Sequence, residues 1–155
     1  MTHENHMRRA IALSCEPVGP GGGPFGAVIV QDGRIVAEGT NQVVPANDPT
    51  AHAEIVAIRR ACAALGRFDL RGCTIYTSCE PCPMCLGAIY WARLDRIFYA
   101  NDRQDAAAIG FDDDFLYREM PLPPAERAIP MQRLLPTEGL AAFTAWARNP
   151  ARVRY

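Results

Sequence analysis

A long apolar run and a strong net charge are both missing from this chain of 155 residues. No stretch stays apolar over the roughly 20 residues that a membrane-spanning helix needs, which predicts a protein without a membrane segment. The formal net charge of -1 gives no electrostatic reason to expect a nucleic acid as partner, so a small ligand fits better. The first six residues lack the basic-then-apolar order of a signal peptide, and we expect a cytoplasmic protein.

Internal repeats and linkers are also absent from the sequence. A length of 155 residues suits one domain, so we expect a single domain over residues 1–155. The hydrophobic share of 49% and the charged share of 21% lie near the averages of soluble globular proteins and exclude disordered and fibrous classes. Residues 19–23 are rich in glycine, but no Lys-Ser or Lys-Thr pair follows them, so we expect a flexible loop rather than a phosphate-binding loop.

The spacing of apolar residues predicts alternating helices and strands. Residues 3–15 have the spacing of an amphipathic helix, on which we expect His3 and His6 to be exposed. Asp32 and Gly33 separate two β-prone runs and predict a hairpin. The expected strands cover residues 25–30, 35–38, 73–77, 96–100 and 131–135, and the expected helices cover residues 3–15, 51–65, 83–93 and 139–149. Because a strand, helix and strand in succession form a parallel crossover, these elements predict a three-layer α/β/α sandwich with a mixed five-stranded central sheet.

The six cysteines divide into two groups. In a chain without an export signal they are expected to be reduced thiols or metal ligands rather than disulfides. Cys15, Cys62 and Cys73 stand among apolar residues, which is typical of buried small hydrophobic side chains. The other three cysteines are concentrated in residues 78–85 and require a separate explanation.

His52, Cys82 and Cys85 supply the ligand set of a catalytic zinc, which takes three nitrogen or sulfur ligands and leaves a fourth position for water. Cys82 and Cys85 are three residues apart at a helix start, so they share one face, and the helix N-terminus favours their thiolates. Glu54 lies two residues after His52. A metal beyond the tip of that helix would let His52 coordinate it and let Glu54 reach the bound water.

Cys79 leaves a second interpretation open, because a fourth sulfur would close the site as a structural Cys3His zinc in a protein that is not an enzyme. A lone Cys-x-x-Cys is also compatible with a redox motif. Against the closed site, Glu80 and Pro81 separate Cys79 from the helix turn, so we expect Cys79 to end the preceding strand. The closed site would also leave Glu54 without a function.

His-x-Glu followed by Pro-Cys-x-x-Cys is the signature of zinc-dependent base deaminases, and both halves match here at every fixed position, in residues 52–54 and 81–85. Over the longer segments 24–28, 47–54, 76–93 and 110–113, the chain resembles the bacterial guanine deaminases of the cytidine-deaminase-like fold. The similarity covers nearly the whole chain. It implies a single zinc deaminase domain of the cytidine/deoxycytidylate type over residues 1–155.

The resemblance implies hydrolysis of guanine to xanthine and ammonia, with one Zn²⁺ per subunit and water or hydroxide as its fourth ligand. It further implies that Glu54 protonates the purine ring and carries protons to the leaving amine, and that Asp113 binds this amine. The acidic neighbours Asp112 and Asp114 leave open which carboxylate faces the substrate. The substrate-binding residues implied are Phe25, Asn41, Ala53, Trp91 and Tyr155.

The resemblance also implies a homodimer in which residues 136–155 cross to the partner subunit, where Tyr155 closes the active site. By itself, the sequence of residues 151–155 predicts a frayed tail. Simpler interpretations stand beside the other implied roles. Asn41 could cap a turn, Phe25 and Trp91 could belong to the core, and the acidic run could be a solvated loop.

Two other deaminases share the metal motifs. A tRNA adenosine deaminase usually carries Ile-His-Ser-Arg after the second cysteine, where this chain has Ile-Tyr-Trp-Ala-Arg at residues 89–93, and the chain lacks the basic balance of a tRNA-binding protein. A cytosine deaminase would have a smaller pocket. Other amino-substituted heterocycles, triazines included, are compatible with the sequence. The sequence therefore favours guanine and leaves these alternatives to be tested.

Overall fold

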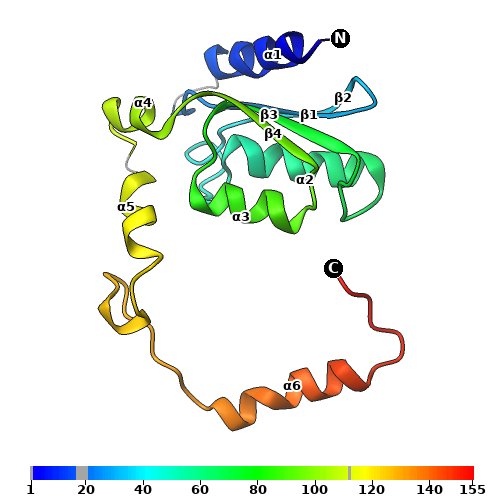
Figure 1. Ribbon diagram of the computed structural model, residues 1–155, viewed down its shortest axis with the longest axis vertical. Coiled ribbons are helices and arrows are strands. Elements are labelled where there is room, and N and C mark those ends of the chain that lie inside the picture. Colours follow the sequence, from blue (N-terminus) through cyan, green and yellow to red (C-terminus); the bar gives the residue numbers. More distant parts are fainter. Residues whose placement is uncertain (1, 17–20, 112) are drawn as a thin grey trace. The chain divides into compact units, whose positions relative to one another are not determined.

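A computed structural model of the chain describes residues 2–16, 21–111 and 113–155 (Figure 1). The chain divides into two compact units, Met1–Asp114 and Phe115–Tyr155. The assignment of both units to one domain stays a prediction. Among the described residues, no helix combines the length and the apolar character needed to span a bilayer.

The first unit contains a mixed sheet with the strand order β2-β1-β3-β4 (Figure 1). The two antiparallel pairs are β1 with β2 and β1 with β3, whereas β4 pairs parallel with β3. Asp32 and Gly33 both have positive φ, as the tight turn between β1 and β2 requires, so the predicted hairpin is confirmed. The strands are β1 (Gly26–Gln31), β2 (Arg34–Thr40), β3 (Cys73–Cys79) and β4 (Arg96–Asn101).

Helices cover both faces of this sheet. Helix α1 (His3–Cys15) lies on one face, and α2 (Ala53–Leu65) and α3 (Pro83–Trp91) lie on the other, which gives the predicted three layers (Figure 1). The start of α2 was predicted two residues too early, because His52 has extended backbone angles and is the N-cap. Three further elements follow β4 before the last helix: α4 (Arg103–Ala108), α5 (Asp113–Glu119) and the short 3₁₀ helix η1 (Pro124–Glu126).

The number of strands was predicted wrongly, because the described residues form four strands rather than five. Residues 131–135, where the fifth strand was expected, are in no strand. Pro130 and Pro136 flank this segment and lack the N–H groups that a sheet ladder needs, and Leu134 is 81% exposed. The final helix α6 (Pro136–Arg148) begins earlier than predicted, with Pro136 in its first turn.

The two faces of the sheet bury separate apolar clusters, because alternate residues of a strand point to opposite sides. Ala27 and Ile29 of β1 belong to the cluster under α2 and α3, while Val28 and Val30 belong to the cluster under α1. His6 was predicted to be exposed, and this prediction is wrong. It lies at 2% exposure beside Tyr76, because its side of α1 faces the sheet.

Candidate active site

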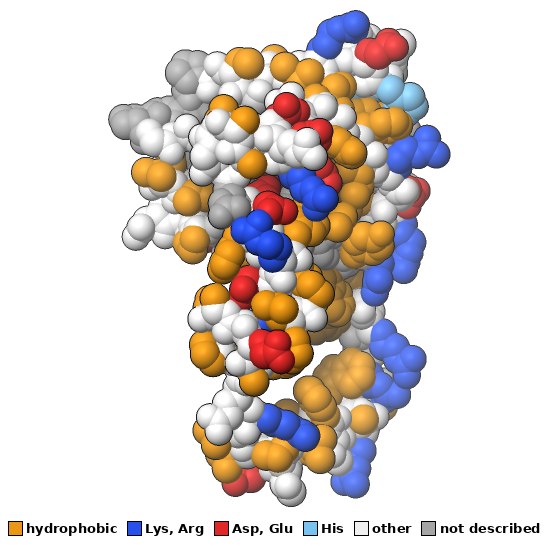
Figure 2. Space-filling view, turned by 60° about the vertical axis from the view of Figure 1, so that its left-hand side comes forward, with side chains coloured by type: hydrophobic (Ala, Val, Ile, Leu, Met, Phe, Trp, Pro, Cys, Tyr) orange, Lys and Arg blue, Asp and Glu red, His pale blue; other side chains and the backbone are white. Residues whose placement is uncertain are grey.

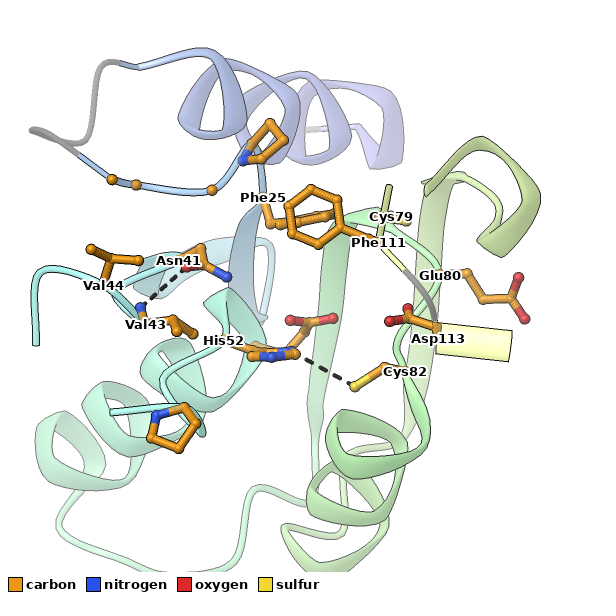
Figure 3. Close-up of a pocket in the computed structure, with 16 residues that line it drawn as sticks. Phe25, Asn41, Val43, Val44, His52, Cys79, Glu80, Cys82, Phe111 and Asp113 are labelled. Atoms are coloured by element: carbon orange, nitrogen blue, oxygen red, sulfur yellow. Dashed lines mark hydrogen bonds between the residues drawn. The ribbon is translucent and has the colours of Figure 1, made fainter. Parts of the chain in front are cut away.

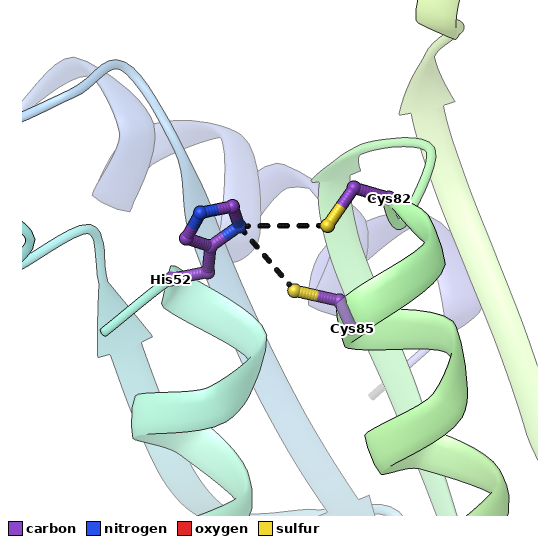
Figure 4. Close-up of side chains that lie close together, drawn as sticks. All are labelled: His52, Cys82 and Cys85. Atoms are coloured by element: carbon purple, nitrogen blue, oxygen red, sulfur yellow. Dashed lines mark hydrogen bonds between the residues drawn. The ribbon is translucent and has the colours of Figure 1, made fainter. Parts of the chain in front are cut away.

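The three predicted metal ligands meet at the starts of two neighbouring helices (Figure 4). His52 is the N-cap of α2, Cys82 is the N-cap of α3, and Cys85 lies in the first turn of α3. Nδ1 of His52 is 3.7 Å from Sγ of Cys82 and 3.5 Å from Sγ of Cys85. All three ligand atoms lie within 4.8 Å of one another.

These separations fit a tetrahedral zinc site. Zinc–nitrogen and zinc–sulfur bonds of about 2.1 and 2.3 Å, at a tetrahedral angle, place the two ligand atoms about 3.6 Å apart. The observed distances of 3.7 and 3.5 Å lie on either side of this value. His52, Cys82 and Cys85 could therefore hold zinc without moving, and three ligands leave one position open.

The protonation of the two sulfurs supports the same conclusion. The hydrogen bond from the Cys85 thiol lowers the pKa of Cys82 to about 4, while this contact and burial raise the pKa of Cys85. Two thiolates at such close range repel each other unless a cation lies between them. A divalent cation that replaces the shared proton would hold both sulfurs as thiolates, as a metal-ligand pair requires.

Cys79 stands apart from this set, as the sequence predicted. It is the last residue of β3, and its thiol donates to the carbonyl oxygen of Asp102 at 3.7 Å. Burial raises the pKa of Cys79 to about 11, which disfavours the thiolate that a zinc ligand needs. Among the described residues, the metal-ligand group contains Cys82 and Cys85 but not Cys79, so the closed Cys3His site lacks its fourth ligand.

Glu54 lies beside the ligand set in the first turn of α2, at 6% exposure. Burial raises the pKa of its carboxyl group, so Glu54 keeps a proton at a higher pH than an exposed glutamate. The hydroxyl of Thr77 on β3 donates to Oε1 of Glu54 at 3.4 Å. A buried carboxyl group with a raised pKa next to a metal site is suited to proton transfer.

A cavity of about 390 Å³ opens over the ligand set (Figure 3). His52, Glu54 and Cys82 line it together with Asp113. On another side, Phe25 and Phe111 meet edge to face with their ring centroids 4.8 Å apart, which provides an apolar aromatic wall. Two of the three metal ligands, the buried acid and an aromatic wall thus face one cavity.

Asn41 also lines this cavity, directly after β2. It is buried at 6% exposure, and its side-chain oxygen accepts a hydrogen bond from the N–H of Val43 at 3.1 Å. The amide nitrogen is therefore the group left to donate into the cavity. Asn41 does cap the turn that follows it, as the simpler interpretation held, but its amide nitrogen remains available to a ligand.

Three other residues that were predicted to bind substrate are not among the residues that line this cavity. Trp91 is 64% exposed at the last position of α3, nine residues after Cys82 and so about 13 Å further along the helix axis. Ala53 is completely buried and does not line the cavity. Tyr155 belongs to the second unit.

The cavity lining distinguishes two of the three consecutive aspartates at residues 112–114. Asp113 lines the cavity, whereas the exposed Asp114 does not. Asp112 lies outside the described residues.

Phe111 and Thr77 were missed by the sequence prediction. Phe111 precedes the acidic run, and that stretch was considered only for its carboxylates. Thr77 belongs to the strand that leads into the cysteine motif, where alternation places it on the same face as Ile75 and Cys79. The strand period could have identified Thr77 as a neighbour of the site, but no sequence signal predicts the edge contact of Phe111 with Phe25.

The three-layer fold, the His-Cys-Cys ligand set and the adjacent buried glutamate together define a zinc-dependent deaminase. The chain belongs to the cytidine and deoxycytidylate deaminase family, whose zinc-binding region matches residues 1–101.

Individual relatives agree with this assignment. The chain is 58% identical to the guanine deaminase of Bacillus subtilis (strain 168) over 156 residues, which covers all of both chains. The crystal structure of a guanine deaminase from Bacillus subtilis superposes with a TM-score of 0.96 at 56% identity and covers 100% of this chain and 99% of that one. A tRNA-specific adenosine deaminase of Agrobacterium fabrum is 46% identical over 86 residues, which covers 56% of this chain and 57% of that protein.

Proposed function

We propose that this protein catalyses the hydrolytic deamination of guanine to xanthine and ammonia. The reaction class follows from the cavity lined by His52, Cys82 and the buried Glu54, beside which Cys85 completes the metal-ligand group. The choice of guanine follows from the 58% identity to a guanine deaminase over the full chain, because tRNA-specific adenosine deaminases are less similar, at 46% identity over 56% of the chain and 39% identity over 72% of it.

The reaction adds water to the ring carbon that bears the amine, breaks the carbon–nitrogen bond and releases ammonia. A zinc ion held by His52, Cys82 and Cys85 supplies Lewis acidity that makes water nucleophilic near neutral pH. We propose that Glu54 takes a proton from the water and gives it to the neighbouring ring nitrogen. It then takes the second proton from the added hydroxyl group and passes it to the leaving amine, as the carbon–oxygen double bond forms and the carbon–nitrogen bond breaks. Its burial supports this role, because a raised pKa brings proton uptake and release closer to neutral pH.

Substrate binding is assigned to the cavity walls. We propose that the rings of Phe25 and Phe111 pack against the purine, that the amide nitrogen of Asn41 donates to it, and that Asp113 receives the departing amine. All four side chains line the cavity, which supports these roles. Ala53, Trp91 and Tyr155 stay predictions as substrate-binding residues, and for Tyr155 the proposal includes a second subunit.

We propose a homodimer in which residues 136–155 cross to the partner. Leu140, Phe143 and Trp146 recur at helical spacing on α6 and are 54%, 75% and 45% exposed within the chain. Figure 2 shows hydrophobic side chains, in orange, on the face of the molecule in view. Such a row of apolar side chains gains stability when a partner covers it. The cytoplasmic location also stays a prediction.

Ammonia release from guanine, adenine, cytosine and a tRNA anticodon stem tests the substrate. We expect release from guanine, and release from the tRNA stem alone would replace guanine with the tRNA adenosine alternative. Glu54→Gln should reduce turnover by about 10²- to 10⁴-fold while zinc per chain is unchanged. A structural zinc protein would release ammonia from none of these substrates.

The dimer and the tail are tested separately from the substrate. Sedimentation should give twice the mass of the 155-residue chain. Deletion of residues 151–155 should lower guanine turnover and leave zinc content unchanged, and unaltered turnover would reject the role of Tyr155.

A further inference from the structure

The glycine-rich loop that precedes β1 forms part of the cavity lining. Gly21, Gly22, Gly23 and Pro24 all face the cavity. The sequence excluded a phosphate-binding role for this loop and left it without a function.

Gly23 lies directly against the side chain of Asn41. A Cβ atom at position 23 would be 3.1 Å from Cγ, 3.3 Å from Nδ2 and 3.4 Å from Oδ1 of Asn41. All three atoms of the amide plane would therefore be in tight contact with an added methyl group. Because carbon–carbon contacts are optimal at about 3.5–4.0 Å, the Asn41 amide would have to move.

The backbone at Gly23 does not itself require glycine. Gly21 has a left-handed φ of 94°, at which any other residue is strained, whereas Gly23 is not among the glycines with positive φ. Alanine at position 23 would therefore meet no conformational penalty of this kind. What glycine provides at position 23 is the space that the Asn41 side chain occupies.

Two hydrogen bonds restrict the movement of Asn41. Its backbone N–H donates to the carbonyl oxygen of Phe25 at 3.2 Å, and its Oδ1 accepts from the N–H of Val43 at 3.1 Å. Figure 3 shows the amide nitrogen of Asn41 on the side away from this Val43 contact. A shift of the amide by a few tenths of an ångström would distort the Val43 hydrogen bond and redirect the nitrogen that donates into the cavity.

We propose that Gly23 is a positioning residue that keeps the Asn41 amide flat against the loop, with Nδ2 aimed at a hydrogen-bond acceptor on the substrate. This inference rests on the proposed function and extends it to the choice of substrate. A fixed donor favours purines that present a carbonyl oxygen or an unprotonated ring nitrogen at this point. A purine that presents an amine there would place two donors against each other.

A double-mutant cycle separates this role from a general effect on the loop. We expect Gly23→Ala to raise KM for guanine and to lower kcat/KM by about 3- to 10-fold, because the amide would move by a few tenths of an ångström and a misplacement of about 1 Å costs up to about 100-fold. In an Asn41→Ala background the same change should have no further effect, because the group that Gly23 positions is gone. Equal losses in both backgrounds, or no loss in either, would overturn the proposal.

Two controls complete the experiment. Gly87→Ala on α3 should leave the kinetics unchanged, since a Cβ at Gly87 meets nothing within 4 Å. The Tm of Gly23→Ala should equal that of the unmodified protein, and a lowered Tm with losses in both backgrounds would show a structural effect and reject the positioning role. If the unmodified protein released no ammonia from guanine, the proposed function would fail first, and the cycle would be repeated with the substrate that it does convert.

Discussion

The two faces of the central sheet are built for different purposes. Under α1, the sheet carries bulky side chains, and Tyr76 stacks on Phe98 with their ring centroids 5.1 Å apart. Apart from Glu54, the buried residues of α2 are small, namely Ala53, Ala57 and Ala61. The small residues bring α2 close to the sheet, and His52 and Glu54 lie at the end of the helix that is held there. One face thus contributes stability, and the other also places reactive groups.

Strand β3 serves both faces within four residues. Tyr76 packs under α1, and Ser78, two residues later on the same side, accepts a hydrogen bond from the N–H of Gly26 at 3.0 Å. Thr77 and Cys79 point to the other side, where Thr77 contacts Glu54 and Cys79 lines the cavity. Alternation along one strand therefore separates structural residues from residues near the reaction.

We expect the largest difference between the two faces when one cysteine on each side of the sheet is replaced by serine. Cys85→Ser should reduce zinc per chain to near zero and lower deaminase activity by more than about 100-fold, because it removes a ligand. The control Cys15→Ser changes a thiol at the end of α1 that is exposed, so the prediction of its burial is wrong, and it should affect neither zinc content nor activity. Zinc content by atomic absorption and ammonia release measure both. Full zinc content in Cys85→Ser would contradict the assigned ligand set.

A smaller effect is expected from two glycines where helices cross the sheet. A Cβ at Gly39 would overlap the carbonyl oxygen of Ala53 on α2, and a Cβ at Gly26 would overlap that of Ala10 on α1. Each change to alanine should lower the free energy of unfolding by about 1–3 kcal/mol, as overpacking does. Only Gly39→Ala should also weaken zinc binding, because it displaces the helix that follows His52.

Urea unfolding measures the stability of the two glycine variants, and zinc titration with a competing chelator measures their zinc affinity. Similar loss of zinc affinity in Gly26→Ala and Gly39→Ala would show that the two faces are not independent.

The smallest effect concerns the pH dependence of the α1 face. Burial, with a further contribution from the charge of His3, lowers the pKa of His6 below 6.5, and its Nδ1 has no hydrogen-bond partner among the described residues. The unfolded chain then binds this proton more readily than the folded one. His6 therefore costs no stability above pH 6.5, and stability falls as the pH decreases below that value.

His6→Phe should flatten this decrease, which thermal unfolding between pH 5 and pH 7.5 measures. His3→Phe removes only the smaller contribution of the His3 charge and should keep most of the decrease, because burial is the largest cause of the lowered His6 pKa. An unchanged pH slope in His6→Phe would show that other groups cause the acid sensitivity.

Local signals predicted most of the elements and the centre of the site. The Asp32-Gly33 pair specified the hairpin, and Pro83 marked the start of α3. The spacing of Cys82 and Cys85 placed both sulfurs at that start. Such features depend on a few adjacent residues, because turn angles and helix starts are fixed by local backbone and side-chain chemistry.

What the sequence determined by itself was the set of chemical groups: His52, two sulfurs, Glu54, and the helix starts that present them. The tertiary structure decided which groups meet. It buried His6 under the sheet, left Trp91 exposed at the far end of α3, and fixed the Asn41 amide between Gly23 and Val43. These outcomes depend on contacts between segments distant in the chain, and the spacing of residues within one segment carries no information about them.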